Sequence, residues 1–199
     1  MKKFICTAPY QTIKAYPYQS EGNNRLTYEG ETGYPVICLL NGYLEPGDEA
    51  EVLVITADYE NARMNYAQIE AEVEEIARKK EARCTVKMLE VPYSEKLDDQ
   101  LAAFGKLIED IHDDDILYAC ITYGSKPTPL IEMMALNYGY RVQKNVSIGC
   151  VVYGQLDFMT KEARIYDVTS LFYMDEIVRT LAESGAKNPL GLIQKLLEG

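Results

Sequence analysis

The chain has 199 residues, of which 47% are hydrophobic and 26% are charged, and these values are typical of an ordinary globular protein with one large domain. Acidic side chains (31) outnumber basic ones (20), and the resulting net charge of -11 argues against a surface that binds long nucleic acid. No apolar run is long enough for a transmembrane helix, and the first residues lack the apolar segment of a signal peptide. We therefore expect a cytoplasmic protein that does not contact a membrane.

Apolar segments that are predicted to form strands alternate along the chain with segments of helical periodicity. The predicted strands cover residues 4–8, 52–57, 84–92, 116–121, 146–154 and 163–168. The predicted helices cover residues 34–44, 59–82, 97–111, 129–136, 171–184 and 190–197. This alternation indicates an α/β fold, with a Rossmann-like, mostly parallel sheet flanked by helices. The last two strands are close in sequence, so we expect them to form a C-terminal antiparallel hairpin.

A tyrosine-rich segment, residues 13–33, separates the first strand from the first helix. Residues 20–24 have the composition of a turn, an extended pattern precedes them, and residues 25–30 can return as a second strand. The segment is predicted to be a β-hairpin insertion after the first strand. Its tyrosines can stack on bases, but tyrosine also suits a half-buried strand, and the structural role is the favoured one.

The sequence carries no pattern that calls for a metal or an organic cofactor. The five cysteines are scattered without a CxxC pair, and we interpret them as reduced core residues (Cys6, Cys38, Cys84, Cys120 and Cys150). His112 is the only histidine, and the aspartates at 113–115 precede a strand, at the edge of the sheet away from the expected ligand. The loop after the first strand lacks a G-x-G-x-x-G fingerprint, which argues against nicotinamide or flavin binding.

Residues 115–140 are the most informative stretch of the sequence. The apolar run 116–121 predicts a strand that is buried on both faces, and a turn with a hydroxyl and an ammonium group follows it. Thr128 is predicted to cap the next helix and Pro129 to occupy its first position. Gly124 lets a ligand approach the backbone, while Lys126 and the free N–H groups of the helix suit a phosphate.

Several features of the chain together resemble a CARF domain, the CRISPR-associated Rossmann-fold sensor. The first strand runs directly into a threonine-containing loop at 7–12, the tyrosine-rich segment includes the sequence at 26–30, and the closing segment is 166–171. The turn at 122–127, Thr-Tyr-Gly-Ser-Lys-Pro, is similar to the Thr-x-Gly-Thr-Lys-Pro-type turn of that family, with Ser125 in place of the commoner threonine. The resemblance covers nearly the whole chain, although its sharpest motif has only six residues.

The resemblance implies a homodimer that binds cyclic oligoadenylate, most often the tetra-adenylate, across a two-fold cleft in type III CRISPR antiviral defence. The residues implied to bind this ligand are Thr7, Ala8, Tyr10, Thr12, Lys14, Thr122, Tyr123, Gly124, Ser125, Lys126, Pro127 and Thr128. Some members of the family also cleave the ring without a metal and leave a 2′,3′-cyclic phosphate. For such a ring nuclease the resemblance gives the catalytic roles to Lys126 and Ser125, and the sequence does not separate cleavage from binding alone.

The resemblance further implies a CARF-like domain at 1–172 and C-terminal helices at 173–199, which serve in dimerisation or as a linker. Two other functions stay open at this point. The chain can be an enzyme of nucleotide or phosphosugar metabolism that holds phosphate with Lys126, or the regulatory domain of a longer effector.

Overall fold

The computed structural model describes residues 1–157 and 159–198, and in this part of the chain seven strands form one sheet in the order β2-β7-β6-β5-β1-β3-β4. The strands are β1 (Lys2–Thr7), β2 (Tyr18–Glu21), β3 (Glu49–Ala57), β4 (Arg83–Val91), β5 (Ile116–Cys120), β6 (Ser147–Leu156) and β7 (Ala163–Asp167). Neighbouring strands are parallel except β6 and β7, which are antiparallel. The predicted α/β class and the C-terminal antiparallel hairpin are therefore confirmed.

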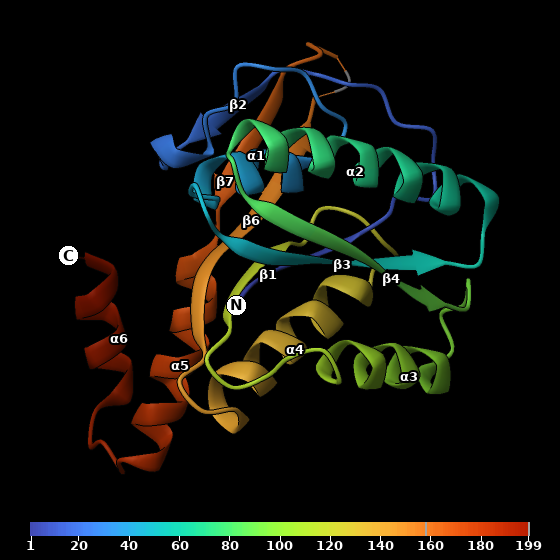
Figure 1. The fold of residues 1–199 in the computed structure, drawn as a ribbon. Coiled ribbons are helices and arrows are strands. Elements are labelled where there is room, and N and C mark those ends of the chain that lie inside the picture. Colours follow the sequence, from blue (N-terminus) through green and yellow to red (C-terminus); the bar gives the residue numbers. More distant parts are fainter. Residues whose placement is uncertain (158, 199) are drawn as a thin grey trace.

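Helices cover both faces of the sheet (Figure 1). They are α1 (Pro35–Tyr43), α2 (Glu60–Lys79), α3 (Leu97–Ile108), α4 (Thr128–Val142), α5 (Thr169–Glu183) and α6 (Pro189–Glu198). Helices α1 and α2 lie on one face, and α3 and α4 lie on the other. Helix α5 lies beside β6, and Phe172 on it is fully buried, so position 172, where the sequence predicted a domain to end, lies inside a packed helix.

The central strands are apolar because helices cover them on both sides. Residues 52–57 of β3 and 117–120 of β5 are all buried, which is the pattern of a parallel sheet enclosed between two layers of helices. The long helix α2 is amphipathic instead, and its buried residues include Ile69, Val73 and Ile76 at spacings of four and three. Because of these two burial patterns, the alternation of strands and helices could be predicted from the sequence.

The predicted β-hairpin insertion is wrong, and the strand that does form overlaps the turn that was predicted at 20–24. Residues 18–21 form β2, but this strand pairs in parallel with β7 and not with a return strand. Residues 24–26 form a short 3-10 helix, which is capped by the Asn23 side chain and anchored by the fully buried Leu26. A single antiparallel bridge between Tyr16 and Thr32 is all that resembles a hairpin among the described residues of this segment.

The five cysteines are free thiols, as predicted, and burial raises the pKa of each of them (Cys6, Cys38, Cys84, Cys120 and Cys150). None of the helices in the described residues is both long and apolar enough to cross a membrane.

Candidate functional site

The candidate site lies at the edge of the sheet where β1 and β5 end side by side. β1 pairs with β3 on one side and with β5 on the other, so it is an interior strand of the sheet, next to the middle strand β5. The chain leaves β5 for α4 on one face, whereas after β1 it passes through β2 and a short 3-10 helix to α1 on the opposite face (Figure 1). Open α/β sheets bind their ligands in the crevice that forms at such a point, outside the carboxyl ends of the strands.

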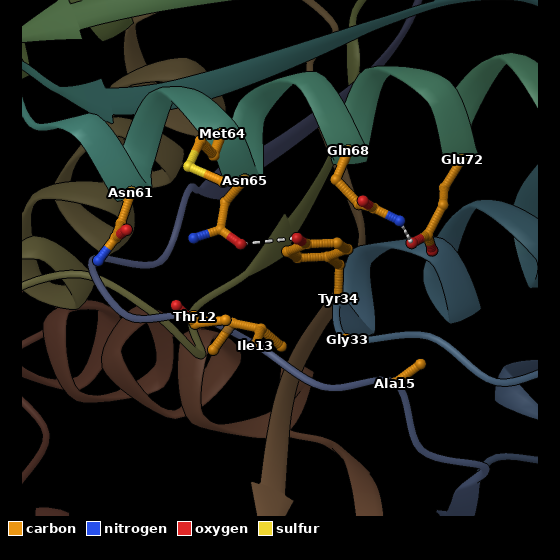
Figure 2. Close-up of a pocket in the computed structure, with 10 residues that line it drawn as sticks. All are labelled: Thr12, Ile13, Ala15, Gly33, Tyr34, Asn61, Met64, Asn65, Gln68 and Glu72. Atoms are coloured by element: carbon orange, nitrogen blue, oxygen red, sulfur yellow. Dashed lines mark hydrogen bonds between the residues drawn. The ribbon is translucent and has the colours of Figure 1, made fainter.

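The loop after β1 is held in place by the side chain of Asn65 on α2. Its Nδ2 atom donates hydrogen bonds to the carbonyl oxygens of Pro9, at 2.8 Å, and Gln11, at 2.9 Å. Its Oδ1 atom accepts a hydrogen bond of 2.7 Å from the Tyr34 hydroxyl (Figure 2). Asn65 is buried, and because its amide is bonded on both sides, it fixes the path of the loop.

A narrow cavity of about 190 Å³ lies between α2 and this loop, and polar side chains of α2 line one wall of it (Figure 2). Asn61 donates a hydrogen bond of 3.2 Å to the carbonyl oxygen of Tyr10, and Gln68 donates one of 3.4 Å to Glu72. Burial raises the pKa of the Glu72 carboxyl, which also accepts a hydrogen bond of 2.6 Å from Thr32. These polar groups are hydrogen-bonded to other groups of the protein. We therefore assign the cavity to the structure that supports the loop.

The turn after β5 has a fixed geometry. The Thr122 hydroxyl accepts a hydrogen bond of 2.8 Å from the backbone N–H of Gly154, and the Tyr123 hydroxyl donates one of 2.7 Å to the carbonyl of Gly33. Gly124 has a φ of +110°, and a Cβ atom there would lie 2.6 Å from the Thr128 side chain. Only glycine fits this position without strain.

The first turn of α4 differs from the prediction in its cap and in its N–H groups. The predicted free N–H groups are not present, because positions 127 and 129 are proline and the N–H groups of Thr128 and Leu130 donate to backbone carbonyl oxygens. Pro127, and not Thr128, occupies the N-cap position, and no side chain caps the helix. Thr128 is the first helical residue, and its hydroxyl lies 3.1 Å from the hydroxyl of Ser125. Lys126 is exposed and has no hydrogen-bond or ion-pair partner in residues 1–157 and 159–198.

Beneath this turn, Thr7 at the end of β1 and Glu132 on α4 are buried together. The Thr7 hydroxyl donates a hydrogen bond of 2.8 Å to Oε1 of Glu132, whereas Oε2 of Glu132 has no partner among the described residues. Complete burial raises the pKa of Glu132 to about 8, and the Thr7 hydrogen bond opposes this shift. The Glu132 carboxyl is therefore largely protonated at neutral pH.

The largest described hollow at this edge is a cavity of about 630 Å³. It is lined by Gln11, Thr12, Ile13, Lys14, Tyr16, Tyr18, Thr122, Tyr123, Tyr153, Gly154, Gln155, Leu156 and Lys161. Two of its cations, Lys14 and Lys161, are exposed in a molecule whose net charge is -11. The cavity therefore offers aromatic surface and positive charge together.

The structure brings only part of the predicted ligand-binding set into this cavity. Thr12, Lys14, Thr122 and Tyr123 line it. Thr7 and Ala8 are buried, while Tyr10 and Ser125 line a neighbouring cavity on the α3 side. The remaining predicted residues, Gly124, Lys126, Pro127 and Thr128, form the turn and the start of α4 between the two cavities.

Sequence reasoning missed the contribution of β2, β6 and the segment between β6 and β7. Tyr18 on β2, Tyr153 and Gln155 on β6, and Lys161 all line the larger cavity. Burial raises the pKa of Tyr18 to about 12, so its phenol stays neutral near pH 7 and can donate a hydrogen bond. The sequence signal that was available is that β6 ends at the same edge as β1 and β5.

Comparison with known proteins gives one partial similarity. No protein-family model matches the chain. Over 97 residues, 48% of this chain, it is 32% identical to the CRISPR-associated protein MJ1674 of Methanocaldococcus jannaschii. The matched stretch is only 15% of that protein's length, so this chain corresponds to a small part of its relative. The protein is thus distantly and partially similar to a CRISPR-associated protein and has a Rossmann-like α/β sheet.

Proposed function

We propose that this chain is a dimeric sensor that binds cyclic oligoadenylate, in the first place cyclic tetra-adenylate, in type III CRISPR antiviral defence. The partial similarity to a CRISPR-associated protein supports the biological setting. The observation that carries the ligand class is Lys126, an exposed cation at the start of α4 that has no partner among the described residues, in a molecule of net charge -11. A cation in this position suits a small polyanion at the ligand edge of the sheet.

The start of α4 supports binding of a phosphate. The helix dipole adds partial positive charge there. The first N–H groups of α4 do not contribute, because Pro127 and Pro129 have none and the N–H groups of Thr128 and Leu130 donate to the carbonyl oxygens of Ser125, at 2.9 Å, and Pro127, at 3.0 Å. No side chain caps α4, and the Lys126 ammonium group supplies a full charge beside it. The phosphates of the ring lie against residues 124–128, and its bases reach the aromatic surfaces on either side.

The exposed side of α4 supports a two-fold dimer next to the phosphate site. Leu130 is 67% exposed and Met134 is 50% exposed, and their spacing of four residues places them on one side of the helix. An isologous contact through this side brings the two copies of the turn at 122–128 together. Each copy then offers the same groups to one half of a symmetric ring.

The same geometry is compatible with slow cleavage of the ring. The ribose 2′-oxygen attacks the adjacent phosphorus, the bond to the 5′-oxygen breaks, and the products are a 2′,3′-cyclic phosphate and a 5′-hydroxyl. The 2′-hydroxyl proton is lost to water, and the departing 5′-oxygen takes up a proton. Lys126 stabilises the charge on the phosphate oxygens, and the Ser125 hydroxyl orients the phosphate.

Calorimetry with cyclic tri-, tetra- and hexa-adenylate tests the binding proposal. We expect the wild-type protein to bind the tetra-adenylate and the Lys126→Ala variant to bind it at least about tenfold more weakly, since one charge-assisted phosphate contact is lost from each protomer. Lys144→Ala is the matched control, because Lys144 is also exposed but follows the opposite end of α4.

The outcome that overturns the proposal is a folded wild-type protein that binds none of the three rings. Chromatography of the ring after long incubation decides the cleavage step separately. If the ring is bound but stays intact, the proposal of a sensor stands and the proposal of a ring nuclease is rejected.

A further inference from the structure

A second cavity, of about 300 Å³, lies on the α3 side of the turn, and the function proposed above does not account for it. It is lined by Tyr10, Tyr93, Ser94, Glu95 and Ser125. Tyr10 follows β1, and residues 93–95 follow β4, so the cavity is built from loops at the carboxyl ends of the strands. Ser125 belongs to the turn that leads into α4, so this cavity directly adjoins the proposed phosphate site.

One wall of this cavity belongs to an aromatic cluster that is open to solvent. The ring of Tyr93 stacks on the ring of Tyr59, with centroids 5.0 Å apart and planes inclined by 22°. It also meets Tyr10 edge to face, with centroids 5.1 Å apart. Tyr93 is nevertheless 60% exposed and Tyr59 is 41% exposed. Tyr10 also packs against the hydrophobic core and so anchors the two exposed rings, and the cluster presents a preorganised aromatic surface.

We propose that this cavity, with Tyr93 as its stacking surface, is a subsite for a nucleobase that carries an exocyclic amino group. The inference rests on the proposed function in one respect: the base belongs to a ligand whose phosphate lies at the start of α4. Aromatic side chains that bind bases supply a flat surface which accepts any base by stacking. A volume of about 300 Å³ accommodates a single purine ring.

The polar rim of the cavity selects among bases. An ionised carboxylate only accepts hydrogen bonds, so Glu95 favours a base edge with an amino donor and disfavours a carbonyl edge. Adenine presents such an amino group, and hypoxanthine presents a carbonyl oxygen at the same position. The Ser125 hydroxyl is within reach of both the base and the turn, because it lines the cavity and lies 3.1 Å from the Thr128 hydroxyl at the first position of α4.

Titration of single variants with cyclic tetra-adenylate tests this subsite. We expect Tyr93→Ala to weaken binding by about tenfold or more, because a stacked base is lost in each protomer, whereas Tyr93→Phe keeps the ring and binds like the wild type. Tyr173→Ala is the matched control, since Tyr173 is also exposed but lies on α5 and lines neither of the two cavities. The thermal midpoint of each variant separates a loss of stacking from a loss of folding.

A second arm tests the role of Glu95. The wild-type protein is expected to bind the adenine ring more tightly than a matched hypoxanthine ring, and Glu95→Ala is expected to bind the two equally. The subsite is overturned if Tyr93→Ala binds like the wild type, or if a folded Tyr93→Phe variant binds as weakly as Tyr93→Ala. It is also overturned if the wild-type protein does not distinguish the two rings.

Failure of the proposed function gives a different result. If the wild-type protein binds no cyclic oligoadenylate, adenosine 5′-monophosphate is titrated while the amide resonances are followed by NMR. If the amide resonances that shift belong mainly to residues 93–95 and 125, the proposal of a base subsite stands although the sensor function is rejected. If this nucleotide shifts none of these resonances, the subsite falls as well.

Discussion

Glu132 is the residue at which the site departs most from ordinary protein chemistry. It is a carboxyl with 0% exposure that receives one hydrogen bond, from Thr7, and it leaves its second oxygen without a partner among the described residues. An unpaired polar atom in the interior is costly, and protonation reduces this cost because a neutral carboxyl is easier to bury. Glu132 therefore links the end of β1 to α4 and makes that link sensitive to pH.

The pKa of Glu132 predicts a pH-dependent stability. This pKa rises from its ordinary value of 4.5 to about 8 in the folded protein. Between these two values the folded state holds a proton that the unfolded state has released, so the Glu132 contribution to the free energy of unfolding decreases as pH rises, by about 1.4 kcal/mol per unit at most. Below this window the carboxyl is protonated in both states, and above it the loss is complete.

Replacement of Glu132 by glutamine isolates this effect, because glutamine is neutral and can still accept the hydrogen bond from Thr7. We expect Glu132→Gln to gain stability relative to the wild type as the pH is raised from about 5 to about 8. Urea unfolding of both proteins across this range measures the difference. Two curves that stay parallel would show that Glu132 titrates normally in the folded protein.

At the scale of elements, helix α2 acts as the support of the loop after β1. Its Asn65 side chain makes three hydrogen bonds to the segment around the site, two of them to the carbonyl oxygens of Pro9 and Gln11. The neighbouring Asn61 makes a single hydrogen bond of 3.2 Å to the carbonyl oxygen of Tyr10. The position of Thr12 and Lys14 in the larger cavity therefore depends on a helix that contributes no residue to that cavity.

The two asparagines provide a matched pair of variants for this support. We expect Asn65→Ala to lower the free energy of unfolding by about 3 kcal/mol, because it strips the partners from several buried polar groups. Asn61→Ala is expected to cost about 1 kcal/mol or less, because it removes one longer hydrogen bond from a less buried residue. Urea unfolding compares them, and equal losses in the two variants would contradict the support role of Asn65.

At the scale of the whole molecule, the proposed dimer depends on which apolar side becomes covered. Leu130 and Met134 on α4 are exposed, and so are Leu192 and Leu196 on α6. Only the α4 side adjoins the turn at 122–128, so a ligand that spans two copies requires the contact to be there. The C-terminal helices, which the sequence suggested for dimerisation or as a linker, are the alternative interface.

Sedimentation measurements distinguish the two interfaces. We expect the wild-type protein to be a dimer, Leu130→Glu to be a monomer because it places a charge in an apolar contact, and Leu101→Glu on α3 to remain a dimer. Leu101 is the control because it is 52% exposed on a neighbouring helix of the same face. A dimer that survives Leu130→Glu and dissociates in Leu196→Glu would move the interface to α6.

The sequence predicted those parts of the molecule that depend on local pattern. The apolar runs of β3 and β5 and the amphipathic α2 were visible because their period matches their burial. The return strand at 25–30 was wrongly predicted because Asn23 and Leu26 stabilise a 3-10 turn, and β2 pairs with β7, a strand more than a hundred residues away. Such a pairing depends on the tertiary fold and leaves no local signal.

The residues of the candidate site were likewise predicted only where a local sequence pattern indicates them. Residues next to a strand end in sequence, such as Thr12 and Thr122, were found, because the carboxyl ends of parallel strands share one edge of the sheet. Tyr18 and Tyr153 were missed, because they reach the cavity only through the pairing of β2, β7 and β6. Thr128 was assigned as the helix cap because Pro129 after it suits the first helical position, but the helix begins one residue earlier and its N-cap is Pro127.

The interior position of β1 has a consequence for the stage of synthesis at which the candidate site can form. One of its neighbours, β3, starts at residue 49, but the other, β5, starts at residue 116. During translation the first strand therefore waits for more than half of the chain before its second edge is covered, and such distant pairing is slow. A copy that ends before β5 has no crevice between β1 and β5, and so it lacks the candidate site.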